Sequence, residues 1–489
     1  MNATAEASDK LGITYGNVDL QGFRCILLRR VEAGEYAQVL HEDDGWVLCR
    51  VDEVRDESSL TQKDVSALIN GADVDIKEAL VADVSIIGYR DSRGILTKPR
   101  SPLRAGVYVC RAEGDKISSV LGLGDRPEKG AYIGLLYDHD VSVYVDINGM
   151  VQKHVSILAK TGGGKSYLVG VLIEELIKHQ VTCVIIDPHG EYGTLAVPSK
   201  PSKDMDRYRV TPHDYSKNVK IFSPDQTVNP GTLPLRFSIA NMTAREILAL
   251  TGGKGQKRSI APLAKVLEFL KEHRKDKPYN LDDIIHILEA DDETAKSPLL
   301  PDLYYIKEMG FITEKGTPIS ELIERGKTTV INMKGSQPEV QEIIVNRIAS
   351  ALFELRKRDK IPPLLMVVEE CHNFVPQYGE VASSKTMRTI ASEGRKFGLG
   401  LVVVSQRAAK VDKNVLSQCN TQFILKITNP NDLAMVEKSI EGMTKGMIDQ
   451  IQSLPIGVAL VSTPYLAMPI LVEVRPRETL HGGESIKVV

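Results

Sequence analysis

The chain has 489 residues, a length that predicts about three domains. Hydrophobic residues make up 42% and charged residues 26%, as is typical of a globular protein. Its net charge of −3 excludes a protein covered in positive charge, so any contact with nucleic acid must be local, at a groove or a pore. The six cysteines form no CxxC pair, and no apolar stretch reaches the roughly 18 residues of a membrane-spanning helix. We therefore expect a reducing, cytoplasmic setting and no membrane contact.

The first hundred residues predict a small β-barrel. Two apolar segments, 36–40 and 46–51, flank the pair Asp44-Gly45, which is typical of a tight hairpin because glycine tolerates a positive φ. Further strand-like segments follow, and the proline-containing segment 98–102 is the expected linker out of the barrel. We place this domain at residues 1–100.

Beyond residue 130 the order strand, loop, helix repeats, which predicts an α/β fold with a parallel sheet covered by helices. The blocks 101–240 and 329–475 are assigned to one sheet. The expected strands are 155–158, 181–186, 364–368, 399–404 and 423–427, with helices at 167–179 and 384–396.

Residues 241–328, between these blocks, predict a helical insertion because helix-forming residues replace the β-branched runs. The expected helices are 244–251, 261–273, 281–289 and 320–325. Basic residues of this insertion are candidates for contact with a polyanion, although a solvated helix face is the favoured interpretation: Lys254, Lys257, Arg258, Lys265, Lys271, Arg274, Lys275 and Lys277. Residues 476–489 are expected to form a polar tail.

Residues 159–166, Ala-Lys-Thr-Gly-Gly-Gly-Lys-Ser, match the phosphate-binding pattern G-x-x-x-x-G-K-[ST] except at Ala159. Glycines let backbone N–H groups close around a phosphate, Lys165 supplies charge to the β- and γ-phosphates, and the Ser166 hydroxyl is a ligand for Mg²⁺. A glycine-rich turn that binds nothing is disfavoured by the strand before it and the helix after it. The motif therefore predicts ATP and Mg²⁺ as cofactors, bound by Lys160, Thr161, Gly162, Gly163, Gly164, Lys165, Ser166 and Tyr167.

Two consecutive acids, Glu369 and Glu370, follow the apolar segment 364–368. ATP hydrolysis needs a carboxylate for Mg²⁺ and a base that orients the attacking water, both best carried at the tip of a buried strand. We assign Glu369 to the metal and Glu370 to the base. A strand that simply ends in solvated acids is the alternative, which the accompanying phosphate-binding motif makes weaker.

Two further polar residues extend this candidate site. Gln406 follows the next predicted strand and is expected to sense the γ-phosphate. Arg395, in the segment Glu393-Gly394-Arg395-Lys396, is a candidate to reach the nucleotide of a neighbouring subunit in a ring. Without a ring, a surface arginine bonded to nearby carbonyls is the better interpretation.

These motifs, in this order, resemble the HerA family of hexameric DNA translocases, within the HerA/FtsK group. The resemblance covers nearly the whole chain and includes 187–192, Asp-Pro-His-Gly-Glu-Tyr, and a closing Val-Arg-Pro-Arg at 474–477. It implies a RecA-like P-loop ATPase core, a barrel of the HAS type in front and an inserted helical bundle. It also implies that Arg395 is the arginine finger, Asp187 a further acid of the nucleotide site, and Lys153 a basic sensor where relatives carry arginine.

The same resemblance implies a homohexamer on duplex DNA, with a nuclease of the NurA type docked on the barrel and fed with DNA ends during double-strand break resection. DNA contacts are expected from loops 377–384 and 408–414, the second of which carries Lys410 and Lys413, and Lys385 and Arg388 are further candidates. Such contacts would lack sequence specificity because they meet phosphates, and an ordinary solvated surface residue is an equally good interpretation for each. His189 lacks a second His or Cys at ligand spacing, so a packing role is favoured over a metal site.

Two alternative functions stay open at this point. One is a related motor that serves anti-phage defence or DNA transfer. The other is an ATP-dependent assembly scaffold, which would have no need of the lysines in loop 408–414.

Overall fold

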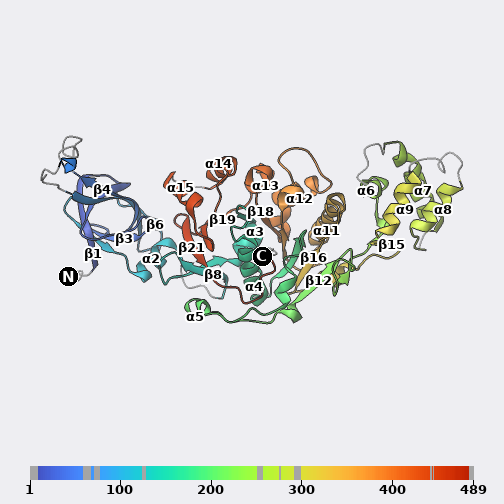
Figure 1. The fold of residues 1–489 in the computed structure, drawn as a ribbon, viewed down its shortest axis with the longest axis horizontal. Coiled ribbons are helices and arrows are strands. Elements are labelled where there is room, and N and C mark those ends of the chain that lie inside the picture. Colours follow the sequence, from blue (N-terminus) through green and yellow to red (C-terminus); the bar gives the residue numbers. More distant parts are fainter. Residues whose placement is uncertain are drawn as a thin grey trace.

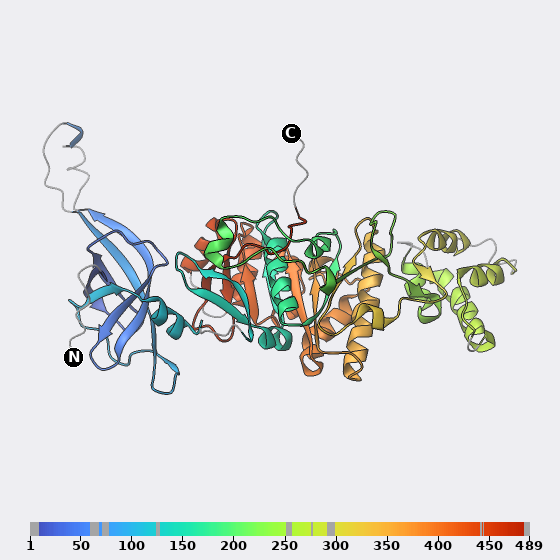
Figure 2. The ribbon, with the colours of Figure 1, turned by 90° about the horizontal axis from the view of Figure 1, so that it is seen from below.

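The computed structural model describes residues 9–58, 68–70, 78–123, 128–250, 257–274, 277–290, 299–440, 443 and 445–483. Three parts follow one another along an elongated molecule: a β-barrel at one end, an α/β core in the middle and a helical unit at the other end (Figures 1 and 2). Within the described residues, no helix has both the length and the apolar character that a membrane crossing requires.

The barrel is a seven-stranded antiparallel sheet in the order β2-β1-β7-β3-β4-β5-β6, and a second pairing of β2 with β5 closes it. Its strands are β1 (Lys10–Val18), β2 (Gly22–Leu27), β3 (Tyr36–His41), β4 (Gly45–Ser58), β5 (Glu78–Arg90), β6 (Leu96–Thr97) and β7 (Tyr108–Arg111). The predicted hairpin is confirmed, with Leu40 opposite Trp46 and Gly45 at a φ of 74°.

The expected barrel boundary at residue 100 needs a correction. Strand β7 pairs with both β1 and β3, so the barrel sheet includes residues up to Arg111. Segment 98–102, expected to lead out of the barrel, instead connects β6 to β7 within it. A proline-containing turn looks the same in sequence whether the chain leaves a sheet or returns to it.

The core is built on a twelve-stranded sheet in the order β13-β12-β16-β11-β17-β18-β10-β19-β20-β21-β8-β9. Pairings from β13 to β19 are parallel and those from β19 to β9 are antiparallel. The parallel part contains β13 (Leu233–Pro234), β12 (Val219–Ser223), β16 (Thr328–Asn332), β11 (Thr182–Asp187), β17 (Leu364–Val368), β18 (Leu399–Ser405), β10 (Val155–Leu158) and β19 (Thr421–Ile424). The antiparallel extension contains β20 (Val458–Ser462), β21 (Ile470–Val474), β8 (Gly130–Leu136) and β9 (Ser142–Asp146).

The assignment of both blocks to one parallel sheet is confirmed, because β10, β11, β17, β18 and β19 all lie in it. Every residue of β10, β11, β17 and β18 is buried, as expected for strands covered by helices on both faces. The helices of the core are α3 (Ile147–Lys153), α4 (Lys165–Lys178), α5 (Asp204–Tyr208), α11 (Pro338–Lys357), α12 (Ser384–Glu393), α13 (Lys413–Leu416), α14 (Pro430–Ser439) and α15 (Lys445–Ser453), and α2 (Gly114–Leu121) leads in from the barrel.

The helical insertion is joined to the core through a short parallel pair, β14 (Phe237–Ser238) with β15 (Ile312–Thr313). Its helices are α6 (Ala244–Ala249), α7 (Lys257–Arg274), α8 (Leu281–Glu289) and α9 (Leu299–Glu308), and α10 (Ile319–Leu322) follows β15. Capping boxes at Thr243 and Asn280 fix the starts of α6 and α8. Among the basic residues considered for polyanion contact, Lys254 and Lys275 and the side chains of Lys257 and Arg258 lie outside the described residues.

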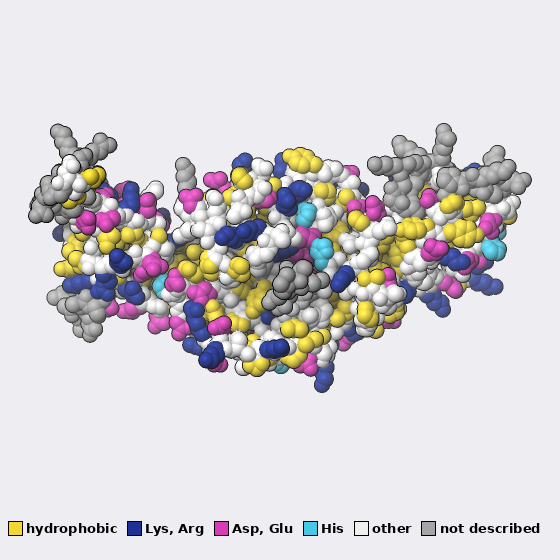
Figure 3. Space-filling model, viewed as in Figure 1, with side chains coloured by type: hydrophobic (Ala, Val, Ile, Leu, Met, Phe, Trp, Pro, Cys, Tyr) yellow, Lys and Arg dark blue, Asp and Glu magenta, His cyan; other side chains and the backbone are white. Residues whose placement is uncertain are grey.

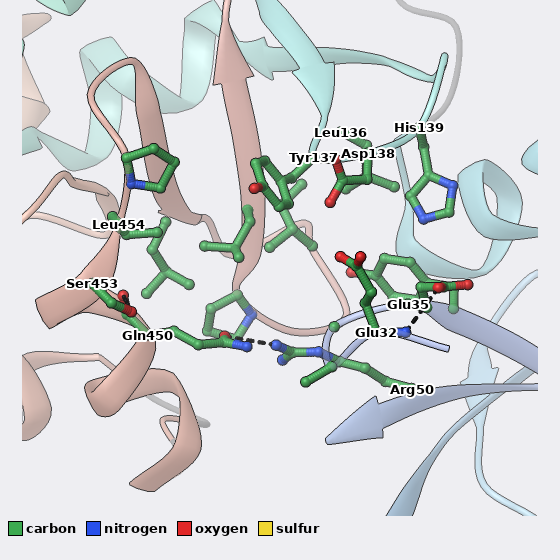
Figure 4. Close-up of a pocket in the computed structure, with 18 residues that line it drawn as sticks. Glu32, Glu35, Arg50, Leu136, Tyr137, Asp138, His139, Gln450, Ser453 and Leu454 are labelled. Carbon is green, nitrogen blue, oxygen red and sulfur yellow. Dashed lines mark hydrogen bonds between the residues drawn. The ribbon is translucent and has the colours of Figure 1, made fainter. Parts of the chain in front are cut away.

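The barrel meets the core around a cavity of about 210 Å³ (Figure 4). Arg50 of β4 is buried and donates a 2.9 Å hydrogen bond to Gln450 Oε1 of α15. On the other side of this cavity, Glu32 and Glu35 of the barrel face the β8–β9 turn at Asp138 and His139 (Figure 4). A buried charge with a specific partner thus joins the two domains.

The segment after β21 is buried against α4, whereas the sequence predicts a polar tail. Arg475 is fully buried; its guanidinium lies 2.9 Å from Glu174 and 2.8 Å from Glu175, both on α4. Glu174 also accepts hydrogen bonds from Thr479, at 2.9 Å from the backbone N–H and 2.6 Å from the hydroxyl. Polar residues are buried here because each charge has a partner, which hydropathy alone does not reveal.

We expect Arg475→Met to lower the free energy of unfolding by about 3 kcal/mol, because it leaves the Glu174 and Glu175 carboxylates buried without their cation. Urea unfolding of the purified protein measures the loss. Arg104→Met is the matched control, since Arg104 is 75% exposed. Equal unfolding midpoints for the two variants would contradict a structural role for the Arg475 cluster.

Candidate nucleotide-binding site

The loop between β10 and α4 has the backbone that phosphate binding requires. Gly162 and Gly164 adopt φ values of 73° and 91°, which only glycine adopts without strain, and Gly164 directly precedes α4. The loop is closed by a 3.0 Å bond from Gly163 N–H to the Lys160 carbonyl and fixed to the β19 side by a 2.9 Å bond from Lys160 N–H to the Lys426 carbonyl. The start of α4 therefore presents the unpaired N–H groups that favour an anion.

Ala159, which departs from the usual glycine, is compatible with this loop. Its side chain is 1% exposed and packs in the apolar cluster beneath the sheet edge, and its φ is outside the left-handed region. Gly163 is the more constrained position, because an added Cβ would lie 3.0 Å from the Lys160 carbonyl oxygen.

Strands β11, β17, β18 and β10 are parallel neighbours, so the residues that follow them meet at the carboxyl edge of the sheet. Lys165 Nζ contacts Glu369 Oε1 and lies 2.8 Å from Glu370 Oε1. The Tyr192 hydroxyl donates a 2.6 Å bond to Glu369 Oε2. Gln406 donates to Glu370 and accepts a bond from the Thr161 hydroxyl, which joins the phosphate-binding loop to the acids.

Lys165, Glu369 and Glu370 are buried, and the charge state of each depends on the other two. Burial opposes the charge on Lys165, but the two carboxylates outweigh burial and raise the pKa of its amine. Burial raises the pKa of Glu369. In Glu370 burial acts in the same direction, yet the Lys165 charge and the bonds from Lys165 and Gln406 outweigh it, so the pKa of Glu370 is lowered. Glu370 is therefore the acid held more firmly as a carboxylate.

Glu370 also has an unusual backbone conformation, with a φ of 49° that side-chain-bearing residues rarely adopt. Its Oε2 is buried without a hydrogen bond, and His372 Nδ1 lies 3.2 Å from it and 3.0 Å from Ser405 Oγ. Burial lowers the pKa of His372. A strained residue with a free carboxylate oxygen is typical of a catalytic position.

Asp187 organises the loop that follows β11. Its carboxylate accepts backbone bonds from Gly190 at 2.8 Å, Glu191 at 3.1 Å and Tyr192 at 3.0 Å. Burial raises the pKa of Asp187 to about 6 despite these bonds. Asp187 is fully buried behind the nucleotide cavity, and its bonds set the position from which Tyr192 reaches Glu369.

A cavity of about 720 Å³ opens over the loop and the start of α4. Of the predicted nucleotide-binding residues, Lys160, Thr161, Gly162, Gly164, Lys165, Ser166, Tyr167 and Gln406 line it, whereas Gly163 and Asp187 do not. The rest of the lining comes mostly from α5, the segment before β20 and the C-terminal segment: Glu191, Asp204, Arg207, Tyr208, Leu425, Ile456, Gly457, Val474, Pro476, His481 and Gly483. Of these, Glu191, Val474 and Pro476 lie in motifs that the sequence marked, at 187–192 and 474–477, but none was assigned to the nucleotide.

Comparison with known proteins agrees with this geometry. The family model described as "Helicase HerA, central domain" matches residues 131–352. A DNA double-strand break repair helicase HerA of Pyrococcus furiosus is 28% identical over 94% of this chain and 92% of its own length. A probable helicase of Methanocaldococcus jannaschii is 27% identical over 98% of this chain and 93% of its own. The chain is similar to HerA helicases over nearly its whole length.

This similarity supports the enzyme class of an ATPase and helicase. Among solved structures, VirB4 of Thermoanaerobacter pseudethanolicus is similar over 71% of this chain and 96% of that one, at 15% identity and a TM-score of 0.48.

Arg395 lies at the opposite edge of the sheet from Lys165. Arg395 lies before the start of β18, whereas the nucleotide site lies after the ends of the parallel strands. The seven residues of β18, which separate the two, span about 20 Å. Its guanidinium therefore does not reach the Lys165 cluster of its own chain. Lys153 ends α3, with its Nζ 5.8 Å from the centre of the Tyr465 ring.

The candidate DNA-contacting residues differ in their exposure and pairing. Lys410 and Lys413 are exposed, and Gln377 joins their loop to the one after β17 through bonds of 2.8 Å with the Lys410 carbonyl and with the Lys413 N–H. Lys385 is exposed on α12. Arg388 is instead paired with Asp412 at 2.7 Å and Glu380 at 3.0 Å. On the face shown in Figure 3, basic and acidic side chains are interspersed, so positive charge is local.

We expect Tyr192→Phe to lower the free energy of unfolding by about 1–3 kcal/mol, because it removes the donor from the buried Glu369 Oε2 without changing the ring volume. Tyr279→Phe is a matched control, since the buried Tyr279 hydroxyl has no partner among the described residues. Thermal and urea unfolding of both variants provide the measurement. A loss of the same size in Tyr279→Phe would show that the Glu369 bond is not the cause.

Proposed function

We propose that this chain is an ATP-driven DNA motor that works as a homohexamer on duplex DNA in the repair of double-strand breaks. One observation carries the proposal: Lys165, Glu369 and Glu370 form a buried cluster at the edge of the sheet, and Gln406 joins it to the exposed Thr161 of the phosphate-binding loop. A strand that merely ended in solvated acids would not produce it. The names of the relatives, double-strand break repair helicases, support the choice of substrate.

In this proposal the triphosphate lies along the loop 159–164 and the start of α4, and Lys165 turns from the acids to the β- and γ-phosphates. Glu370, the acid with the lowered pKa, is the base that orients the attacking water. Gln406 bonds both Glu370 and Thr161 of the phosphate-binding loop. It is therefore placed to change the position of Glu370 when a γ-phosphate binds.

The residues fit Mg²⁺ as a cofactor. Ser166 lines the cavity beside Lys165, and Glu369 contacts the Lys165 amine. The Ser166 hydroxyl and the Glu369 carboxylate are hard oxygen donors, which suit an ion that also takes phosphate and water oxygens as ligands. Among the described residues there is no group of three or more His, Cys, Asp or Glu that would hold a metal without nucleotide. When bound, Mg²⁺ neutralises phosphate charge. Ser166 and Glu369 would hold it there.

Arg395 supports a ring because it cannot serve its own chain's nucleotide. It is exposed at the amino edge of the sheet, and an arginine supplied from a neighbour stabilises charge in phosphoryl transfer and makes hydrolysis depend on assembly. DNA would pass through the centre of the ring, against the exposed lysines Lys410 and Lys413.

The barrel is the proposed docking site for a nuclease of the NurA type, which would receive DNA ends from the motor. Three large hydrophobic side chains on or next to β2 are exposed and support a protein contact: Leu20 at 44%, Ile26 at 40% and Leu28 at 59%.

For the nucleotide site, Glu370→Gln should retain ATP binding and lose turnover by about 10²-fold or more, because the amide keeps the shape but cannot act as a base. Lys165→Ala should lose binding as well. Nucleotide affinity and steady-state hydrolysis, measured on the same preparations, separate the two effects. Glu354→Gln, at an exposed acid of α11, is the control; normal turnover in Glu370→Gln would remove Glu370 as the base.

For the DNA contact, changing Lys410 and Lys413 together to Ala should weaken duplex binding and flatten its dependence on salt, because phosphate contacts release counterions. The matched control changes Lys265 and Lys271 of α7, two exposed lysines that we interpret as a solvated face. Binding is measured at several salt concentrations. Equal losses in the two double variants would point to general charge rather than a pore.

A further inference from the structure

A second cavity, of about 560 Å³, lies at the amino edge of the central sheet, opposite the nucleotide cavity. It is bounded by α3, by the starts of β11 and β17, and by the turns before β16 and β18. Two of its lining residues are arginines, Arg325 and Arg395, and among the described lining residues there is no Asp or Glu. The cavity thus carries uncompensated positive charge at the sheet edge.

The two arginines are separated by three strand spacings. Arg325 precedes β16 and Arg395 precedes β18, with β11 and β17 between them, so their backbones are about 14 Å apart. Both side chains are exposed, and neither guanidinium has an ion pair or hydrogen bond within the described chain. Two long side chains from these positions can approach opposite sides of one polyanion.

Both arginines stand on fixed backbone. Next to Arg395, the Phe397 carbonyl accepts a 2.6 Å bond from the buried Arg356, which also bonds Asp359 at 2.9 Å. Next to Arg325, Gly326 N–H donates a 3.0 Å bond to the Thr182 hydroxyl. At this edge of the sheet, Arg356 is therefore paired within the chain, whereas Arg325 and Arg395 lie on hydrogen-bonded turns and have no partner within the described residues. Such preorganised cations suit an oxyanion ligand.

The end of α4 also lies at this edge, since His179 and Gln180 line the cavity. The carbonyl end of a helix carries about half a negative charge, which is smaller than two full guanidinium charges. The cavity therefore remains suited to an anion.

We propose that Arg325 and Arg395 together bind the phosphates of the nucleotide held by a neighbouring copy of the chain, and that Arg325 is a second arginine acting in trans. The inference rests on the proposed ring, in which Arg395 already serves the neighbour, and adds a residue that no sequence motif marked. Bidentate pairing with phosphate oxygens is the chemistry that recognises the ligand. A free phosphate or pyrophosphate shares that chemistry, so the test must separate the two sources.

The test uses mixed assemblies, co-expressed with two affinity tags and purified through both. One subunit carries Lys165→Ala, which disables its own nucleotide site but leaves Arg325 and Arg395 intact. The other carries Arg325→Ala and keeps its nucleotide site. We expect Arg325→Ala alone to lower kcat/KM for ATP about 10-fold, and the mixed assembly to recover activity because the Lys165→Ala subunit supplies the missing arginine.

A parallel mixture of Arg395→Ala with Lys165→Ala tests the ring itself. Recovery in the Arg395 mixture without recovery in the Arg325 mixture overturns the role of Arg325 and leaves the proposed function standing. Failure of both mixtures contradicts the trans arrangement altogether. Arg358→Ala, at an exposed arginine outside this cavity, should retain wild-type activity, and thermal unfolding verifies that each variant is folded.

Pyrophosphate titrated into Lys165→Ala protein by calorimetry identifies the source of the anion. Saturable binding that disappears in the Lys165→Ala/Arg325→Ala double variant, combined with no recovery in the Arg325 mixture, would show a free anion site and exclude the trans assignment. The proposal predicts recovery in the mixture and no such binding.

Discussion

The site depends on the burial of one lysine between two carboxylates. Lys165 is 7% exposed and sits at the start of α4, where the neighbouring N–H groups already favour an anion. Its charge is tolerated there because Glu369 and Glu370 follow an adjacent region of the same parallel sheet. The pairing with Lys165 also lowers the pKa of Glu370. One ion pair therefore both holds the Lys165 amine in place and keeps Glu370 as a carboxylate.

Helix α4 connects this cluster to the rest of the core. Its first residue is Lys165, and its second half carries Glu174 and Glu175, which bind the buried Arg475. The C-terminal segment that Arg475 anchors returns to the nucleotide cavity at Pro476 and His481. The segment after α15 also lines two cavities, with Leu454 and Pro455 at the barrel seam and Ile456 and Gly457 at the nucleotide. The nucleotide cavity is therefore built from segments that also hold the domains together.

The sequence predicted the features that depend on residues close together in the chain, namely single strands, single helices and the P-loop. Strands β10 and β17 and helix α8 were predicted to the residue, and the P-loop motif identified the part of the cavity lining that comes from residues 160–167. Pairings between distant segments were not predictable, because neither the antiparallel extension of the sheet nor the position of β7 leaves a local signal. The burial of residues 477–479, which were expected to belong to a polar tail, was missed for the same reason: their partner Glu174 lies some 300 residues away on α4. Tyr192 and His372 joined the site only once the strand ends were brought together.

In the proposed ring, hydrolysis at the Lys165 cluster is completed by a neighbouring copy of the chain on DNA. The most direct measurement is the rate of ATP hydrolysis with and without duplex DNA, on material whose mass in solution is determined at the same time. We expect activity to belong to the assembled species, to rise with duplex DNA and to fall when dilution produces monomers. Full activity in a monomer would contradict the proposed ring.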